Sequence, residues 1–341
     1  MSVFTQLTRP RTERLLLVGA GHTHLYLLRH AARLQAQGYD ITLVAPPVFS
    51  YSGNAVAVAL GTLPSSAGRI CVATLAQRVG VRHLAGTVRE IDPSNGTAVT
   101  DIGESIHWDV LTLNIGSVSR RPDIELGGGS DDVLAAKPVG QLRRLAHLTA
   151  GADRPVVVVG AGSTGIEVAA QLSSRSSRPI TLISASDKIG PGLPTAARDH
   201  LHNLLSERGV RILTRRRVRH LHDHCARLED DTTVPYAAAV LATGLAAPPA
   251  VAQWGLGDRR GIPVLESLRH RDRSDIYAAG DCKLPCTIPH APGRARRPPG
   301  AGPPRCPHRA SGRTPGARLQ PRGEAPDYPR PRRRHSAGCA W

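Results

Sequence analysis

Two short glycine-rich stretches carry the clearest chemistry of this sequence. In the first, an apolar run at residues 15–18 ends at Gly19-Ala20-Gly21, and a helical pattern follows. This order predicts a buried strand, a tight turn and a helix N-terminus, where free amide groups and the helix dipole favour a phosphate. We expect Gly19 to permit the turn and Gly21 to let a pyrophosphate approach the backbone. The stretch therefore predicts a bound dinucleotide, the alternative being a glycine turn of the kind found in any α/β protein.

The first stretch lacks the third glycine of the usual Gly-x-Gly-x-x-Gly pattern, and His24 stands in its place. Because that glycine allows close packing of helix on strand, His24 implies a wider approach. His22 and His24 lie where they could contact the bound dinucleotide or its phosphates, since a neutral histidine can donate a hydrogen bond there. For His24 the alternative is a packed side chain that fills the missing glycine's space.

The second stretch has the complete pattern. A run of four valines at residues 156–159 leads into Gly160, Gly162 and Gly165, and a helix is predicted through residue 172. Strand, turn and helix are the context that the motif needs. Glu167 falls in the first part of that helix, where an acidic residue on the helix surface is the alternative to a ligand contact.

The sequence also contains an internal repeat. Strand, glycine turn, helix, strand, meander and a strand ending in glycine occur twice, first from Gly19 to Gly116 and then from Gly160 to Gly244. The expected elements include helices over 25–37 and 196–207, a helix that follows Ala136-Lys137-Pro138 and ends at about residue 150, and strands over 41–45, 179–184 and 210–213. Two meanders are also expected, the first with strands over 81–91, 97–102 and 105–108 and the second over about 217–234. Two such units predict an α/β fold with two Rossmann-like domains and two nucleotides, an electron carrier and a prosthetic group.

A later strand, within residues 274–281, ends in Gly280-Asp281. A carboxylate there could accept a hydrogen bond from a sugar-like hydroxyl. The alternative is an aspartate that caps a helix.

Composition limits the other possibilities. The 341 residues are 40% hydrophobic and only 3% aromatic, contain no run long enough for a membrane span, and begin without the apolar core of a secretory signal. The six cysteines form no CxxC, so we expect no metal site and a reducing, cytoplasmic setting. Peripheral contact with the inner face of a membrane is compatible with this composition.

The net charge of +17 is concentrated in the last residues. The segment 289–341 holds twelve Arg and twelve Pro but one Leu, and carries +10. Such a composition cannot bury enough apolar surface to offset the entropy of ordering, so we expect a disordered tail. One hypothesis is a shift of reading frame between about residues 283 and 289; the other is a genuine basic tail that binds acidic partners.

Together these stretches resemble the FAD-dependent pyridine nucleotide–disulfide reductase superfamily over about residues 15–283. Within it the chain looks most like the type II NADH dehydrogenase-like branch. The segments Gly21-His22-Thr23-His24, Tyr51-Ser52-Gly53 and Lys137-Pro138 resemble NADH dehydrogenase-like proteins found joined or adjacent to selenide, water dikinase.

The resemblance implies an FAD domain at 1–122 and 245–288, an inserted NAD(P) domain at 123–244 and the tail at 289–341. It places Gly19 and Gly21 at the FAD pyrophosphate, Asp281 at the ribityl or phosphate region, and Glu167 near the nicotinamide. It assigns the NAD(P)H pyrophosphate to Gly160, Gly162 and Gly165, and further cofactor contacts to Gly116, Lys137, Gly244 and Gly280. The implied activity is hydride transfer from NAD(P)H to flavin, then electron delivery to an acceptor for which a quinone is the first candidate. A homodimer is compatible with the family pattern, and no side chain need act as a catalytic acid or base.

Two departures from the family pattern limit this assignment. No pair of cysteines lies near the first turn, which disfavours disulfide and sulfide chemistry. The strand after the second turn ends Ile183-Ser184-Ala185 without the acid that favours NAD, so NADH and NADPH both stay open, with Lys188 as a weak candidate for a 2′-phosphate. Besides the oxidoreductase, an inactive nucleotide-binding partner module and a nucleic-acid-binding protein that uses the tail remain as alternatives, although no nucleic acid is expected.

Overall fold

A computed structural model describes residues 12–120, 123–127, 131–137, 139–148, 154–174 and 178–284. The Arg- and Pro-rich segment 289–341 lies outside the described residues, and so do the two hypotheses about its origin. Within the described part of the chain, no helix has both the length and the apolar character that crossing a membrane requires.

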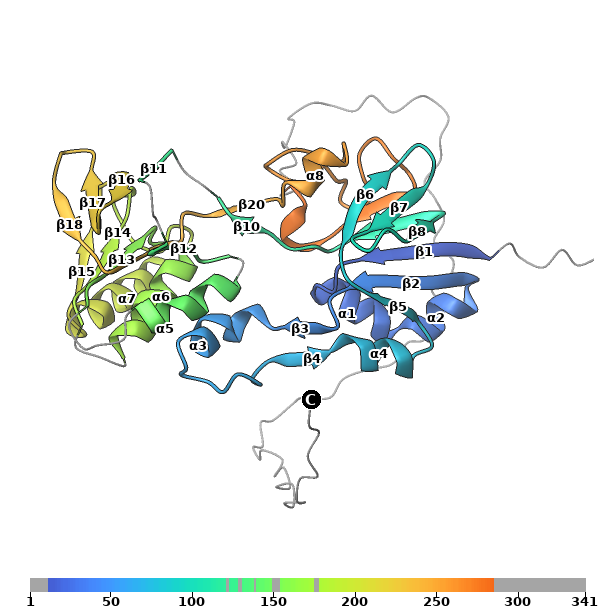
Figure 1. The fold of residues 1–341 in the computed structure, drawn as a ribbon, viewed down its shortest axis with the longest axis horizontal. Coiled ribbons are helices and arrows are strands. Elements are labelled where there is room, and N and C mark those ends of the chain that lie inside the picture. The colour runs from blue at the N-terminus through green and yellow to red at the C-terminus, as the bar shows by residue number, and fades with distance from the viewer. Residues whose placement is uncertain are drawn as a thin grey trace, which may run out of the picture. The chain divides into compact units, whose positions relative to one another are not determined.

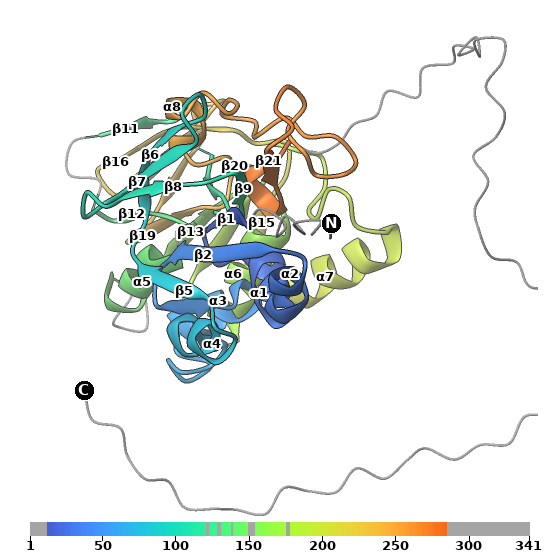
Figure 2. The same cartoon turned by 90° about the vertical axis from the view of Figure 1, so that its right-hand side faces the viewer.

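The first glycine turn belongs to a five-stranded parallel sheet with the strand order β21-β9-β1-β2-β5. Figure 1 labels β1, β2 and β5 of this sheet. The last four residues of β1 are all buried, as expected for a parallel strand that is covered on both faces. Helix α2 packs on β2 and α4 on β5, and Figure 2 shows α1 and α2 together beside β2. The elements of this unit are β1 (Glu13–Val18), α1 (His22–Arg29), α2 (Ala31–Ala36), β2 (Tyr39–Ala45), α4 (Val72–Arg78), β5 (Arg82–Ala85), β9 (Val110–Leu113) and β21 (Ile276–Ala278).

The second glycine turn belongs to another parallel sheet of five strands, in the order β12-β19-β13-β14-β15. Its strands β13, β14, β15 and β19 occupy the places of β1, β2, β5 and β9 in the first sheet, so the internal repeat predicted from sequence is confirmed. Helix α6 packs on β13 and β14, and α7 on β15. The elements are β12 (Val133–Ala135), η2 (Val139–Leu142), α5 (Arg143–Leu148), β13 (Val156–Val159), α6 (Ser163–Ser173), β14 (Ile180–Ile183), α7 (Thr195–Glu207), β15 (Val210–Leu213) and β19 (Ala238–Leu241).

Each unit carries an antiparallel meander between its third and fourth parallel strands. The first is β6 (Val88–Asp92), β7 (Thr97–Thr100) and β8 (Ser105–His107). The second is β16 (Val218–His222), β17 (Cys225–Leu228) and β18 (Thr233–Pro235), with β11 (Glu125–Leu126) added beside β16. Both meanders agree with the alternating patterns in the sequence, and the Asn95-Gly96 turn joins β6 to β7 as predicted.

Three further segments complete the fold. The strands β10 (Val118–Ser119) and β20 (Leu245–Ala246) pair antiparallel where the chain passes from one sheet to the other. Strands β3 (Val48–Ser50) and β4 (Arg69–Cys71) form a ribbon that carries η1 (Ser52–Asn54) and α3 (Ala55–Ala59), and apolar residues of α3 belong to the core of the second sheet. The last elements are α8 (Ala250–Gln253) and η3 (Gly280–Cys282).

The structure corrects three element predictions. The helix expected over 25–37 begins at His22 and is broken at His30, whose amide bonds the Leu27 carbonyl instead of continuing the α-helical ladder. The strand expected over 81–91 is split at Gly86, which has a φ of 153° and lies against Asp101. Where a helix was expected after Ala136-Lys137-Pro138, the chain first forms the 3-10 turn η2 and only then α5, and the expected end near residue 150 lies outside the described residues.

Candidate nucleotide-binding sites

The first glycine turn is fixed by contacts between β1, α1 and the end of β9. Gly19 has a φ of 88°, and its amide donates to the Val44 carbonyl at 2.8 Å. A Cβ at Gly19 would lie 2.6 Å from the Asn114 carbonyl oxygen, so both the backbone conformation and the close approach require glycine there. The turn prediction for Gly19 therefore has a direct structural cause.

Asn114 is the central residue of this site, and the sequence analysis did not single it out. Its buried side chain accepts hydrogen bonds from the amides of Thr23 and His24 at the start of α1, at 3.1 and 3.3 Å, and donates to the Ala279 carbonyl at 2.7 Å. It thus joins the ends of β1, β9 and β21. A buried polar residue at the end of an apolar strand, just before Gly116, was the available signal.

Two predicted cofactor glycines owe their identity to Asn114. A Cβ at Gly21 would lie 2.3 Å from Asn114 Oδ1, and one at Gly280 would lie 2.6 Å from Asn114 Nδ2. Gly21 was expected to leave room for a pyrophosphate; the structure shows that it leaves room for the Asn114 amide. Both residues shape the turn from behind, and their direct contact with a ligand stays a prediction.

His24 fills the place of the missing third glycine. It is buried, and its ring nitrogens lie 2.6 Å from the Gly19 carbonyl oxygen and 2.6 Å from Thr112 Oγ1. Because the carbonyl can only accept, Nδ1 carries the proton and Nε2 accepts from the Thr112 hydroxyl. Burial lowers the pKa of His24 to about 4, so the ring is neutral near pH 7. The packed alternative describes His24, and the structure does not support the cofactor contact assigned to it.

The second turn shows why glycine or histidine serves at this position. A Cβ at Gly165 would lie 1.8 Å from the Gly160 carbonyl oxygen, so α6 approaches β13 as closely as glycine permits. His24 and Gly19 hold the equivalent positions in the first turn, where the imidazole binds the same carbonyl. This agrees with the wider approach that the sequence implied.

An open cavity of about 440 Å³ begins at the first glycine turn. Gly116 lines it, and a Cβ at Gly116 would meet no atom within 4 Å. Backbone of the glycine turn forms one end, whereas apolar side chains form much of the remainder, a surface suited to a phosphate next to a flat aromatic ring. The lining residues include Gly19, Ala20, Gly21, Val44, Phe49, Ser50, Asn114, Ile115, Gly116, Pro248 and Trp254.

A polar cluster follows β21 near this turn. Lys137 Nζ lies 2.9 Å from Asp281 Oδ2 and 3.1 Å from Ser117 Oγ, and the Ser117 hydroxyl donates to the same carboxylate oxygen at 2.9 Å. The hydrogen bond from Lys137 is the main cause that holds the pKa of Asp281 below its usual range, with further contributions from Ser117 and from His22. Asp281 is thus a half-exposed anion with one oxygen engaged by protein and one free for a ligand.

His22 lies at the exposed start of α1. Its ring makes edge-on contacts with Phe49 and Tyr51, with centroids 5.2 and 5.5 Å apart. These contacts join the glycine turn to the ribbon of β3 and β4. A ligand contact for His22 stays a prediction.

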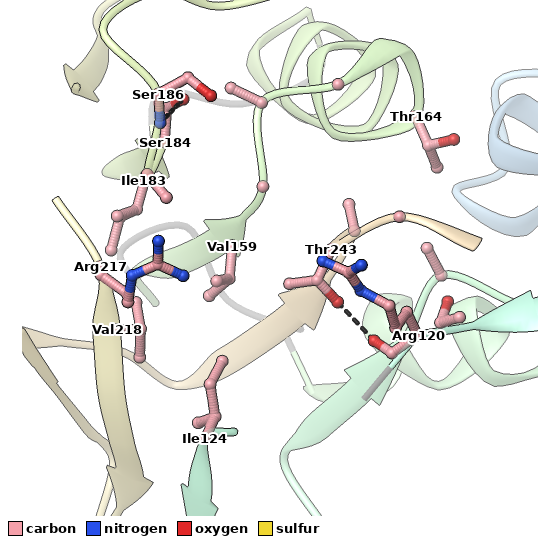
Figure 3. Close-up of a pocket in the computed structure, with 18 of the residues that line it drawn as sticks. Arg120, Ile124, Val159, Thr164, Ile183, Ser184, Ser186, Arg217, Val218 and Thr243 are labelled. Atoms are coloured by element: carbon pink, nitrogen blue, oxygen red, sulfur yellow. Dashed lines mark hydrogen bonds between the residues drawn. The ribbon is translucent and has the colours of Figure 1, made fainter. Parts of the chain in front are cut away.

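The second glycine turn opens onto a larger cavity of about 870 Å³. Gly160 has a φ of 104°, and its Cβ position lies 2.3 Å from the Ala242 carbonyl oxygen, so it faces protein. Gly162 differs, because a Cβ there would meet no atom within 4 Å and would enter the cavity. Figure 3 shows this cavity, with Val159, Thr164 and Thr243 around it.

The start of α6 supplies donors for an anion at this cavity. Among the described residues, the amides of Ser163, Thr164 and Gly165 have no hydrogen-bond acceptor in the protein, and the first intrahelical bond runs from Ile166 to the Gly162 carbonyl. Free amides and the positive end of an 11-residue helix form a phosphate site. Lys137 and Gly244 also line the cavity, and their contact with a cofactor stays a prediction.

Glu167 does not line the second cavity. It is half-buried on α6, and burial raises the pKa of its carboxyl group. The alternative of a side chain on the helix surface fits this position better than a nicotinamide contact. Gly165 is required for helix packing, because its Cβ position lies against Gly160 and Ala242.

No other catalytic constellation is found in the described ranges. They contain no group of three or more His, Cys, Asp or Glu residues placed to hold a metal ion. Their three cysteines are free: Cys71 is exposed, Cys225 is partly buried and Cys282 is buried. No cysteine pair is available there for disulfide chemistry.

Two glycine turns at equivalent places of two parallel sheets, each opening onto its own cavity, define a protein built to bind two nucleotides. Residues 13–299 match the family described as pyridine nucleotide-disulphide oxidoreductase, and the chain belongs to this family. The predicted class, a flavin- and pyridine-nucleotide-dependent oxidoreductase with FAD and NAD(P)H as cofactors, is confirmed at this level.

Solved structures show the same fold. A ferredoxin reductase from Rhodopseudomonas palustris matches with a TM-score of 0.69 and 21% identity over 80% of this chain and 69% of its own. A water-forming NADH oxidase from Lactobacillus brevis, bound to NADH, matches with 0.69 and 21% over 80% and 62%. NDH2 from Plasmodium falciparum, in complex with NADH, matches with 0.67 and 17% over 80% and 64%. The chain thus spans less than two thirds of the last two proteins.

Proposed function

We propose that this protein is an FAD-dependent NAD(P)H:acceptor oxidoreductase. The observation that carries the proposal is the pair of equivalent glycine turns, each with an open cavity in front of it. Bound FAD would supply the acceptor for a hydride from NAD(P)H and the means to pass electrons on. The protein's part is to hold and align the two nucleotides.

The residues of the first unit suit FAD. The amide of His22, at the first position of α1, has no acceptor among the described residues, whereas Asn114 already caps the amides of Thr23 and His24. A pyrophosphate would therefore meet a pre-formed, rigid turn with one amide left to donate. The free oxygen of Asp281 would accept a hydrogen bond from a sugar-like hydroxyl.

The residues of the second unit suit the pyridine nucleotide. Its cavity is larger, its helix amides are free, and Gly162 leaves the approach to the backbone open. Lys137 lines this cavity and also binds Asp281, so one lysine contacts both proposed cofactor regions. Such a contact would hold the two nucleotides in a fixed relation.

We further propose the domain boundaries 1–122 with 245–288 for FAD and 123–244 for NAD(P)H. The paired strands β10 and β20 support them, because they are where the chain leaves the first unit and returns. The likeness of the motifs also supports the type II NADH dehydrogenase-like branch, near the proteins associated with selenide, water dikinase. A quinone is the acceptor that this branch suggests.

A test uses the purified full chain. We expect a yellow protein with flavin absorbance that is bleached when NADH or NADPH is added without oxygen. Gly162→Val should keep the flavin and lose the bleaching, since the backbone at Gly162 suits valine, with a φ of −75°, and the side chain would occupy the cavity. Gln171→Val, on the same helix and away from the cavity, is the control and should behave like the wild type.

Each other outcome contradicts a defined part of the proposal. A folded, colourless protein that cannot be reconstituted with FAD would exclude a flavoenzyme. Bound FAD without bleaching would indicate the inactive partner module. Loss of flavin in Gly162→Val would show that the two sites have been exchanged.

A further inference from the structure

The end of β14 is where dinucleotide-binding folds distinguish NADH from NADPH, because an acidic residue there binds the adenosine ribose hydroxyls of NAD. In this chain β14 ends at Ile183 and is followed by Ser184. Ser184 is buried, and its hydroxyl accepts the Ser186 amide at 3.2 Å and donates to the Lys188 carbonyl at 3.3 Å. Its side chain is engaged within the turn, and no carboxylate takes the acid's place.

A group of arginines lies beside this turn. The amide of Arg216 donates to the Ser184 carbonyl and that of Arg215 to the Ser186 carbonyl, both at 2.9 Å. These bonds fix the segment between β15 and β16 against the end of β14. Arg216 and Arg217 line the second cavity. In Figure 3 the Arg217 side chain points into the cavity on the same side as Ile183, Ser184 and Ser186.

Of the three cavity arginines that follow β15, Arg216, Arg217 and Arg219, Arg217 has the longest ion pair. Asp230 holds Arg216 at 2.8 Å. The nearest carboxylate oxygen to Arg217, on Glu229, is 3.8 Å away, beyond hydrogen-bond distance, and the other Glu229 oxygen is engaged by Arg219 at 3.1 Å. The guanidinium of Arg217 therefore has an ion pair with Glu229 but no hydrogen bond to it, and its planar donors can bind a phosphate.

The charge of the cavity points the same way. Its charged lining residues are five cations, Arg120, Lys137, Arg216, Arg217 and Arg219, and one anion, Asp123. Lys137, Arg216 and Arg219 are each paired with a carboxylate within 3.1 Å, and Arg217 lies 3.8 Å from Glu229, so the lining keeps a net positive charge. An additional dianion at the adenosine end would therefore be stabilised, whereas a ribose with two hydroxyls would find no acidic acceptor at the strand end.

From this arrangement we infer that the nicotinamide substrate is NADPH and that Arg217 binds its 2′-phosphate, with Arg216 beside it. The inference rests on the proposed function, since it concerns the same cavity. The candidates for binding the 2′-phosphate are then Arg216 and Arg217, some 30 residues after Lys188, and Lys188 itself does not line the cavity.

The test compares two ligands that differ only in the 2′-phosphate. Binding of adenosine 2′,5′-bisphosphate and of 5′-AMP to the full chain is measured by calorimetry. We expect the bisphosphate to bind at least about ten-fold more tightly, the size of a charge-assisted hydrogen bond. Arg217→Ala should remove most of that difference and change 5′-AMP binding by less than about two-fold. Arg211→Ala, an exposed β15 arginine outside the cavity, is the matched control.

The outcomes separate the inference from the function on which it rests. If 5′-AMP binds as tightly as the bisphosphate, or if Arg217→Ala leaves the difference intact, the assignment of the 2′-phosphate to Arg217 is overturned while the nucleotide site stands. If neither ligand binds and Gly162→Val has no effect on the protein's response to NAD(P)H, both the inference and the proposed site fail.

Discussion

Acidification from pH 7 to pH 5 should destabilise this protein through His24. Its imidazole is buried between Gly19 and Thr112, and burial lowers its pKa to about 4, whereas an unfolded histidine titrates near about 6.5. Between these values the unfolded chain binds a proton that the folded chain excludes. The contribution of His24 to the free energy of unfolding is therefore fully present above about pH 6.5 and is lost as the pH falls toward 4.

The two pKa values give the magnitude. Linkage predicts a loss of about 2 kcal/mol in the free energy of unfolding between pH 7 and pH 5. That is a large share of the roughly 5–15 kcal/mol that stabilises an ordinary protein. Urea unfolding at pH 7, 6 and 5 measures it, in the wild type and in His24→Gln, which keeps a donor and an acceptor but cannot titrate.

The comparison between variants isolates this one residue from the other histidines. We expect His24→Gln to lose less stability on acidification than the wild type, by about 2 kcal/mol. His107→Gln, at an exposed position on β8, should keep the wild-type pH dependence. Equal losses in the wild type and in His24→Gln, or an NMR titration of His24 near its ordinary pKa, would refute the assignment of a buried neutral imidazole.

Three other predictions concern the two turns. Gly21→Ala should release FAD and destabilise the fold, because its Cβ would displace the Asn114 amide. The loss of unfolding free energy should be smaller in an Asn114→Ala background, and additive losses in a double-mutant cycle would contradict this coupling. Gly160→Ala should lower the unfolding free energy by about 1–3 kcal/mol, since Gly160 has a φ of 104° and the new Cβ would clash with the Ala242 carbonyl oxygen. A denaturation midpoint equal to that of the wild type would disprove this strain. Lys137→Met should raise the pKa of Asp281 toward its ordinary value, which carboxyl-carbon NMR would detect. An unchanged titration of Asp281 would show that Lys137 is not the main cause of its lowered pKa.

The repeat could be predicted from sequence because its signals are local. A valine run before Gly160 and a leucine-rich run before Gly19 determine buried strands, and glycine spacing determines the turns that follow. The strand order was not predicted, but the two sheets have equivalent orders, in agreement with the repeat. The two nucleotide cavities were located for this reason.

The contacts that complete each site could not be predicted in the same way. Asn114 binds the start of α1 from the end of β9, about 90 residues later, and Arg216 binds the residue after β14 from the loop after β15. Neither pairing leaves a local pattern in one sequence. His24 is the opposite case. Its position in the glycine motif predicted a ligand contact, but in the structure its side chain is buried and packs inside the turn.

The antiparallel pairing of β10 with β20 has a consequence for how such a chain can change. Val118 pairs with Ala246 and Ser119 with Leu245, so the polypeptide departs from the flavin-side sheet and rejoins it at adjacent points. The segment between β10 and β20 is therefore an insertion whose two ends are paired with each other. Recombination at two neighbouring sites would exchange the whole segment that we propose to bind NAD(P)H, Arg217 included, while the strands on either side keep their register.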